Sequence, residues 1–438
     1  MKVIVLGAGV IGVSTAYFLA KSGHEVTVID KSQSSAEGCS NSNGGQLSYS
    51  HIETWSNKSS LLSMLKNVFL ANSYLHLKDF SNKEFYSWIA EFIKNSSNEN
   101  YIKNCEKLFK ISSLSKSLMQ EILSEEPSLL NGKSFDLSKN GILHFYRNNK
   151  NFEAEIKKLE KFSFINRDFE ILSAEECLKK EPNLTRLNDE KKLAGGIFFK
   201  DDESGDCHKF TQELEKICKE KYEVNFIFDC DIKNLLTNYK KITGINTNKG
   251  VLVADKYIFA LGASSISLLK GIGIDPKIYP VKGYSLSIKC DEEFIAPNFT
   301  MTDNENKIVY SRLGNIFRAA GTVEMSGNNL SINKKNLNFL YSNVEKTFAD
   351  FGDIKNVREW VGLRPFRPNS LPLIGDLSKF SNLLINAGHG SLGWTNALAS
   401  AKIIDDLLAK KEIKDFNFLN KELHEIVDGK NNKIDSEL

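Results

Sequence analysis

The chain has 438 residues, 41% of them hydrophobic, and carries 57 lysines and arginines against 55 aspartates and glutamates. This length predicts two or three packed units with a substantial core, and the nearly even charge disfavours nucleic-acid binding. The seven cysteines are scattered without a Cys-x-x-Cys pair, which is typical of a reducing cytosol and indicates no metal site of the zinc type.

The N-terminus leads directly into an apolar strand and lacks the charged region and small-residue cleavage site of a signal peptide. No stretch reaches the roughly 18 uninterrupted apolar residues that a membrane span requires. We therefore expect a cytoplasmic protein, and peripheral attachment to the inner face of the cell membrane stays open.

Residues 1–30 predict a nucleotide-binding βαβ unit: an apolar strand over 3–6, a Gly-x-Gly-x-x-Gly turn, a helix over 14–22 and a second strand ending at Asp30. The glycines allow the tight turn, the approach of a pyrophosphate and the packing of the helix, whose N-terminus offers free N–H groups. Asp30 is suited to a ribose diol, which favours FAD or NAD over NADP without separating the first two. The predicted contacts are Gly7, Gly9, Val10, Ile11, Gly12, Asp30 and Lys31.

Residues 31–46 are rich in serine, asparagine and glycine and predict an irregular loop. A flexible connection is one interpretation. Loops at the carboxyl edge of such a sheet also hold ligands, so we expect cofactor contacts from Asn43, Gly44, Gly45 and Gln46.

Residues 61–123 follow a helical pattern, with apolar residues at three and four spacing in Leu61, Leu62, Leu65, Val68 and Phe69. A core helix is the favoured interpretation of 61–75, and docking to a partner or a membrane surface is the alternative.

The middle of the chain alternates short elements. A helix is predicted over 152–162 among short strands of residues 141–199, and another over 206–221. The chain is then expected to return to the nucleotide-binding sheet through short strands at 224–228, 242–246, 251–254 and 257–259. After the last of these strands, Gly262 lies in a turn of small residues that allows the backbone to approach a cofactor closely. Residues 278–288 and 307–322 alternate as antiparallel strands covered on one face, which predicts a second, β-rich domain.

Five longer motifs of the sequence are informative together: Val5-Leu6-Gly7-Ala8-Gly9-Val10-Ile11-Gly12, Asp202-Glu203-Ser204-Gly205-Asp206-Cys207, Tyr279-Pro280-Val281-Lys282-Gly283-Tyr284-Ser285-Leu286, Trp360-Val361-Gly362-Leu363-Arg364-Pro365 and Asn386-Ala387-Gly388-His389-Gly390-Ser391-Leu392-Gly393-Trp394-Thr395. With these motifs the chain resembles the FAD-dependent D-amino-acid oxidase superfamily, and within it the small subunits of bacterial D-amino-acid dehydrogenases. The match is loose over residues 50–138.

The resemblance implies an α/β fold with an α+β second domain. A Rossmann-like FAD-binding domain would comprise 1–50, 205–270 and 365–425, and a β-rich substrate domain with a helical insertion would comprise 51–204 and 271–364. It also implies oxidation of a D-amino acid to a 2-oxo acid and ammonia, with electrons passing on to an acceptor, expected to be a quinone. No cysteine lies in the C-terminal flavin loop, so the FAD is expected to be noncovalent. The loop contacts carried over are Gly388, His389, Gly390, Gly393, Trp394 and Thr395.

Oxidation at a flavin requires the substrate Cα–H near the flavin N5, and hydride transfer from a neutral amine needs no enzymic base. The resemblance puts the substrate-carboxylate arginine at Arg364, since a guanidinium grips a carboxylate through two parallel hydrogen bonds. A structural ion pair is its alternative. Tyr284 and Tyr310 are candidates for holding carboxylate or amine, although each fits equally a packed aromatic with a wet hydroxyl. His389 is expected to contact the flavin rather than act as a base.

The segment from Gly393 is expected to open the last helix, through Leu407, with its N-terminus facing the flavin pyrimidine ring. Three alternatives stay open: oxygen as acceptor, a secondary-amine substrate such as a glycine derivative or a D-proline-like imino acid, and a flavin-binding scaffold subunit.

Overall fold

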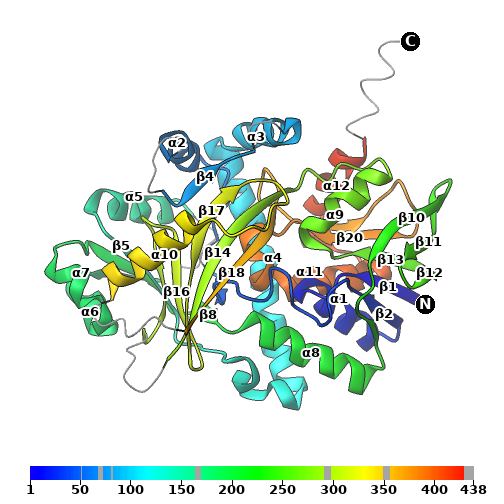
Figure 1. The fold of residues 1–438 in the computed structure, drawn as a ribbon, viewed down its shortest axis with the longest axis horizontal. Helices are drawn as coiled ribbons and strands as arrows, with labels where there is room; N and C mark the ends of the chain where they lie inside the picture. Colours follow the sequence, from blue (N-terminus) through cyan, green and yellow to red (C-terminus); the bar gives the residue numbers. More distant parts are fainter. Residues whose placement is uncertain are drawn as a thin grey trace, which may run out of the picture.

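The computed structural model describes residues 1–50, 52–67, 73–79, 82–162, 169–290, 297–348 and 356–428. A nucleotide-binding sheet with its helices lies beside a larger, mostly antiparallel sheet, as Figure 1 shows on its right and left sides. The predicted fold class, a Rossmann-like unit plus a β-rich α+β unit, is confirmed.

The nucleotide-binding sheet has the order β19-β20-β13-β1-β2-β9, and only the β19–β20 pair is antiparallel. Its central strand is buried on both faces, which is why the sequence there is continuously apolar. The strands are β1 (Lys2–Leu6), β2 (Glu25–Ile29), β9 (Asn225–Ile227), β13 (Lys256–Phe259), β19 (Leu373–Asp376) and β20 (Leu383–Ala387).

The predicted strands at 242–246 and 251–254 do not join this sheet. They belong to a separate antiparallel sheet formed by β10 (Ile232–Asn238), β11 (Lys241–Thr247) and β12 (Gly250–Leu252). Strands β10 and β12 are largely exposed and β11 mixes buried with exposed residues, whereas a central parallel strand is buried and apolar throughout.

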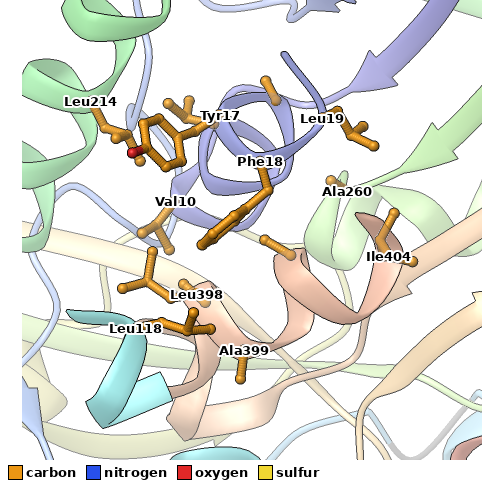
Figure 2. Close-up of a cluster of buried hydrophobic side chains, with 14 of the residues drawn as sticks. Val10, Tyr17, Phe18, Leu19, Leu118, Leu214, Ala260, Leu398, Ala399 and Ile404 are labelled. Carbon is orange, nitrogen blue, oxygen red and sulfur yellow. The ribbon is translucent and has the colours of Figure 1, made fainter. Parts of the chain in front are cut away.

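One face of the nucleotide-binding sheet is covered by α1 (Val10–Lys21), α8 (Cys207–Tyr222) and α11 (Gly393–Leu408), and α4 (Asn98–Glu125) packs on these helices in turn. In Figure 2 Phe18 of α1 points toward Leu398 of α11, and Leu118 of α4 lies beside Leu398. The opposite face is covered by α9 (Ser265–Gly271) and α12 (Phe418–Asp428). Because α12 follows it, α11 is not the last helix, contrary to the prediction.

The second sheet has the order β18-β14-β17-β16-β15-β5-β7-β6, with β4 paired to β17. A small two-stranded sheet joins β3 (Gln46–Leu47) to β8 (Glu203–Ser204). The strands are β4 (Leu75–Leu77), β5 (Ile142–Tyr146), β6 (Phe169–Ser173), β7 (Gly195–Phe199), β14 (Tyr279–Lys289), β15 (Thr300–Asp303), β16 (Ile308–Leu313), β17 (Ile316–Met325) and β18 (Val357–Phe366).

The predicted strands in 278–288 and 307–322 are confirmed as β14, β16 and β17, but β14 is buried on both faces rather than on one. On one face Leu286 packs with Leu340 of α10 (Lys334–Thr347), which crosses the sheet in Figure 1. On the other face the alternate residues Gly283 and Ser285 approach the nucleotide-binding domain.

The helical pattern predicted over 61–123 is interrupted. Helix α2 (Lys58–Asn67) is followed by strand β4 before α3 (Lys83–Asn95) and α4 begin, and Val68 and Phe69 lie outside the described residues. Helix α3 packs Phe85 and Trp88 against the second sheet. The remaining helices are α5 (Asn149–Leu159), α6 (Ala174–Lys180) and α7 (Thr185–Asp189).

Helix α4 belongs to the region assigned above to the substrate domain, yet its buried face packs on α1 and α11. The domain boundaries therefore stay a prediction. Among the helices that the structure describes, none has the length and apolar character needed to cross a bilayer.

Candidate functional site

A cavity of about 990 Å³ runs between the two sheets, at the upper end of the range for small-molecule sites. At one end it begins at the β1–α1 turn and the end of β2. It continues along the 38–48 loop and the start of α11, and it ends against β14, β17, β18 and the α2–β4 segment. The carboxyl ends of the parallel strands therefore open into the cavity.

The β1–α1 turn is built for close backbone approach. Gly7 has φ +108°, and a Cβ on Gly12 would lie 1.8 Å from the Gly7 carbonyl oxygen, so neither position accepts a side chain. The N-cap residue of α1 is Gly9, which has no side chain to cap the helix. One N–H group of the first turn, Val10 N, donates to Ser40 Oγ at 3.0 Å. The remaining N–H groups at this positive helix end suit a pyrophosphate.

Asp30 ties the end of β2 to this turn. Its Oδ2 accepts a hydrogen bond from Ala8 N at 2.7 Å and its Oδ1 accepts one from Ser32 N at 2.8 Å. Each carboxylate oxygen retains a second lone pair, and the side chain lines the cavity, as a ribose diol would require.

The loop that contains Asn43, Gly44 and Gly45 is hydrogen-bonded to the second sheet. Arg318 Nη1 donates to Asn43 O at 3.2 Å, and Ser285 Oγ donates to Ser42 O at 2.8 Å. A Cβ on Gly44 would lie 3.2 Å from Val309 Cγ1, and Gly45 has φ +72° with the Leu313 side chain 3.0 Å from its ideal Cβ. The glycines thus let the loop lie flat between sheet and cavity.

The C-terminal loop presents polar atoms that are buried without a partner. His389 Nε2 and Trp394 Nε1 have no hydrogen-bond partner among the described residues, and both residues line the cavity, with the Trp394 ring packed on Phe210. Burial lowers the pKa of His389 to about 3, so the imidazole is neutral at physiological pH. Helix α11 begins at Gly393 and its N-cap Leu392 supplies no side-chain cap. A flavin ring with hydrogen-bonding edges fits such a surface.

Arg364 stands at the other end of the cavity, on β18 opposite Val281 of β14. Its guanidinium lies over Gly283, where an ideal Cβ would come within 2.3 Å of Cζ and Nη2. Nη1 donates to Thr322 O at 3.2 Å. Burial lowers the pKa of Arg364, but a guanidinium keeps its charge in proteins. No carboxylate among the described residues lies within 4.0 Å of it, which argues against the structural ion pair.

The hydroxyls of the two candidate tyrosines do not reach the cavity. Tyr284 packs toward α10 with its hydroxyl donating to Glu324 Oε2 at 2.8 Å, although the residue contributes to the cavity lining. Tyr310 is fully buried against Phe317 and Phe348 and lies outside the lining. Both side chains occupy the face of the sheet that α10 covers, and their hydroxyls are buried and hydrogen-bonded rather than wet. Their role in holding the substrate therefore stays a prediction, which this placement disfavours.

Most of the other predicted contacts come together. Gly12 and Gly388 do not line the cavity: Gly12 supports the turn, and Gly388, with φ +83°, packs on the Arg367 side chain. The predicted residues that line the cavity are Gly7, Gly9, Val10, Ile11, Asp30, Lys31, Asn43, Gly44, Gly45, Gln46, Gly262, Tyr284, Arg364, His389, Gly390, Gly393, Trp394 and Thr395.

Other lining residues were not predicted. Gly283 lies inside a predicted strand, a pattern that signals a close approach to a neighbouring group and was available in the sequence. Cys39 donates from Sγ to Leu363 O at 2.6 Å, and burial raises the pKa of its thiol to about 11. Trp55 and Met64 come from the α2 region, where the sequence offered no signal that separates a cavity wall from an ordinary core.

Comparisons with known proteins agree with this geometry. The chain is 37% identical over 412 residues to the D-amino acid dehydrogenase of Paramagnetospirillum magneticum, covering 93% of this chain and 95% of that protein. It is 36% identical over 415 residues to the D-amino acid dehydrogenase of Neisseria meningitidis, covering 94% and 96%. Its fold matches glycine oxidase from Geobacillus kaustophilus with a TM-score of 0.72 at 19% identity, covering 94% and 95%.

The family model described as FAD dependent oxidoreductase, DAO, matches residues 2–407. Because this match covers nearly the whole chain, including the turn, loops and strands that enclose the cavity, the chain belongs to the DAO family of FAD-dependent oxidoreductases.

Proposed function

We propose that this enzyme oxidises D-amino acids to 2-oxo acids and ammonia with FAD as its cofactor. The observation that carries the proposal is the guanidinium of Arg364, which faces the cavity at the end opposite the nucleotide-binding turn without an acidic partner among the described residues. Relatives 35–37% identical over most of the chain are D-amino acid dehydrogenases, which supports the substrate class.

Arg364 supplies the carboxylate site. Nη1 is already bonded to Thr322 O, and Gly283 leaves space beneath the guanidinium plane, so the group is held in one orientation. The remaining N–H donors of the planar guanidinium can bind a carboxylate through two parallel hydrogen bonds. Once the substrate carboxylate is held in this way, only one face of its Cα is presented for reaction. Lysine, as a single point charge, would not impose that orientation.

Part of the cavity wall is apolar, although the segment that supplies it also contributes the polar residues Thr54, Asn57 and Ser60. Trp55, Met64 and Leu75 line it from the α2–β4 segment, with Val323 of β17, and the Trp55 ring stands 4.2 Å from the Phe366 ring, centre to centre. This wall suits D-amino acids with small apolar side chains, because an uncompensated charge would be desolvated there. It also gives the described residues 52–67 and 73–75 a role as part of the cavity rather than only as packing.

The residues present fit FAD. The glycine turn and α1 would hold the pyrophosphate, Asp30 the ribose, and the 43–46 and 389–395 loops the ring, whose edges would satisfy His389 Nε2 and Trp394 Nε1. When bound, FAD supplies a two-electron acceptor for the substrate carbon–hydrogen bond. Hydride transfer starts from a neutral amine. Because His389 is not assigned the role of a base, the substrate amine must already be deprotonated when oxidation begins. We propose that the FAD is noncovalent, so that acid precipitation should release it into the supernatant.

We further propose a quinone as the physiological acceptor, reached by peripheral contact with the membrane. The support is the dehydrogenase name of the relatives together with three exposed apolar residues, Leu62 on α2 and Tyr86 and Ile93 on α3. Hydrogen peroxide formed under air in stoichiometric amounts would instead make oxygen the acceptor.

The proposed reaction is tested with a substrate panel and an artificial dye acceptor. Dye reduction by D-alanine should be matched one to one by ammonia and by pyruvate, and L-alanine should give neither. Faster turnover of N-methylglycine or D-proline than of D-alanine would move the proposal to secondary amines. Dye reduction by none of these compounds, with FAD bound, would leave only a scaffold role.

A further inference from the structure

Strand β17 is irregular where it faces Arg364. Lys282 of β14 pairs with Glu324, whereas Tyr284 pairs with Gly321, so two residues of β17 stand opposite the single residue Gly283. This is a β-bulge, and such bulges re-aim backbone groups beside active sites. The first bulged residue, Thr322, has φ +59°, a genuine outlier for a β-branched side chain. Its carbonyl oxygen, turned by the bulge, accepts the Arg364 hydrogen bond.

The bulge is followed directly by a buried carboxylate that bonds to two elements, β14 and α10. Glu324 Oε1 pairs with Lys282 Nζ of β14 at 3.0 Å, with both side chains at most 2% exposed. Its Oε2 accepts from Tyr284 at 2.8 Å and from Asn336 of α10 at 2.7 Å. Hydrogen bonds oppose the effect of burial and hold the pKa of Glu324 at about 2, so it stays ionised. Asn333 Nδ2, at the N-cap of α10, donates to the same oxygen at 3.1 Å.

These two features are adjacent and connected. A strained bulge persists only when its surroundings fix it, and the Glu324 bonds fix β17 to β14 and α10 two residues beyond Thr322. We propose that Glu324 is a positioning residue: by anchoring the bulge, it aims the Thr322 carbonyl at Arg364 and so sets the orientation of the guanidinium for the substrate carboxylate. This rests on the role of Arg364 proposed above. Glu324 itself does not line the cavity.

A double-mutant cycle tests the inference, with Glu324→Gln, Arg364→Gln and the double variant prepared as holoenzymes. Both Glu324→Gln and Glu324→Ala remove the charge that faces Lys282, but Glu324→Ala also removes the hydrogen-bonding group, so it is kept only as a second variant. The matched control is Glu126→Gln. Glu126 is also a buried carboxylate, 2% exposed, that accepts hydrogen bonds from Tyr17 at 2.8 Å and Lys221 at 2.8 Å, but it lies under α1 and lines no part of the cavity.

The measurements are kcat/KM for D-alanine with a dye acceptor, FAD content and thermal midpoint. We expect Glu324→Gln to lower kcat/KM by about ten- to a hundredfold with FAD retained, because misplacing a substrate-positioning group by about 1 Å has effects of that size. In the Arg364→Gln background the same substitution should have no further effect, since a residue acting through Arg364 cannot act once it is gone. Glu126→Gln should leave kcat/KM unchanged.

The outcomes separate the two proposals. If Arg364→Gln itself leaves kcat/KM for D-alanine unchanged, the proposed function of Arg364 fails and the inference with it. If Arg364→Gln is strongly impaired but Glu324→Gln is as active as the wild type, only the inference is overturned. It is equally overturned if Glu324→Gln lowers activity by the same factor in both backgrounds, or if Glu126→Gln lowers it as much, because those results mark a general structural effect.

Discussion

Replacing Gly283 by alanine should disable substrate binding while the fold and the flavin stay in place. The added Cβ would lie 2.3 Å from Cζ and from Nη2 of Arg364, where ordinary contacts begin at 3.4 Å. The guanidinium must therefore move by about 1 Å, a displacement that costs roughly a hundredfold in rate when it affects a substrate-positioning group. The displaced atoms are the mobile end of a side chain. Overpacking should therefore lower the free energy of unfolding by only about 1 kcal/mol, the low end of the usual range for overpacked sites.

The assay is kcat/KM for D-alanine with a dye acceptor, beside flavin absorbance and a urea unfolding curve. Gly271→Ala is the control, since a Cβ there meets no atom within 4 Å. A Gly283→Ala enzyme with wild-type kcat/KM would refute the placement of Arg364 at the substrate. Loss of the flavin together with activity would also refute it, because the residue would then serve the cofactor.

Three further results are expected. Arg364→Lys should lose about 3 kcal/mol of transition-state stabilisation, roughly a hundredfold in kcat/KM, because a bidentate grip becomes a point charge; unchanged kinetics would contradict it. Gly12→Ala should purify without FAD, measured as released flavin per chain, since its Cβ would meet the Gly7 carbonyl oxygen at 1.8 Å; full flavin content would contradict it. In the unfolded chain His389 becomes protonated below pH 6.5, whereas in the folded protein it is protonated only near pH 3. The buried neutral imidazole therefore contributes its full stability above pH 6.5, and this contribution falls as the pH is lowered. Between pH 7.5 and 5 the wild type should lose about 2 kcal/mol more than His389→Gln in urea unfolding, and equal losses would contradict a neutral buried imidazole.

The parts of the site that the sequence predicted are local. In residues 1–30 the apolar strand, the glycine spacing, the helix and Asp30 all lie within one short segment, and each is explained by its immediate neighbours. The structure confirms these elements because no distant contact competes with them. Arg364 was different: its role came from resemblance, and only the structure shows why Gly283 beneath it must lack a side chain.

The misses follow from long-range contacts. Alternation correctly predicted the strands that carry Tyr284 and Tyr310, but it does not say which face meets the cofactor, and a shift of one residue exchanges the faces. The bulge at Thr322 depends on the register between β14 and β17, which no local pattern encodes. Strand β4 was hidden inside a helical pattern because its pairing partner, β17, lies about 250 residues away along the chain.

The central claim is that this cavity oxidises D-amino acids at a bound FAD with Arg364 holding the carboxylate. The measurement that tests it most directly is anaerobic titration of the purified holoenzyme with D-alanine and, separately, with L-alanine, while the flavin absorbance is followed. The account predicts stoichiometric bleaching by D-alanine, none by L-alanine, and none by D-alanine at the same concentrations in Arg364→Gln with FAD still bound. Bleaching by both enantiomers alike, or by neither, would contradict it.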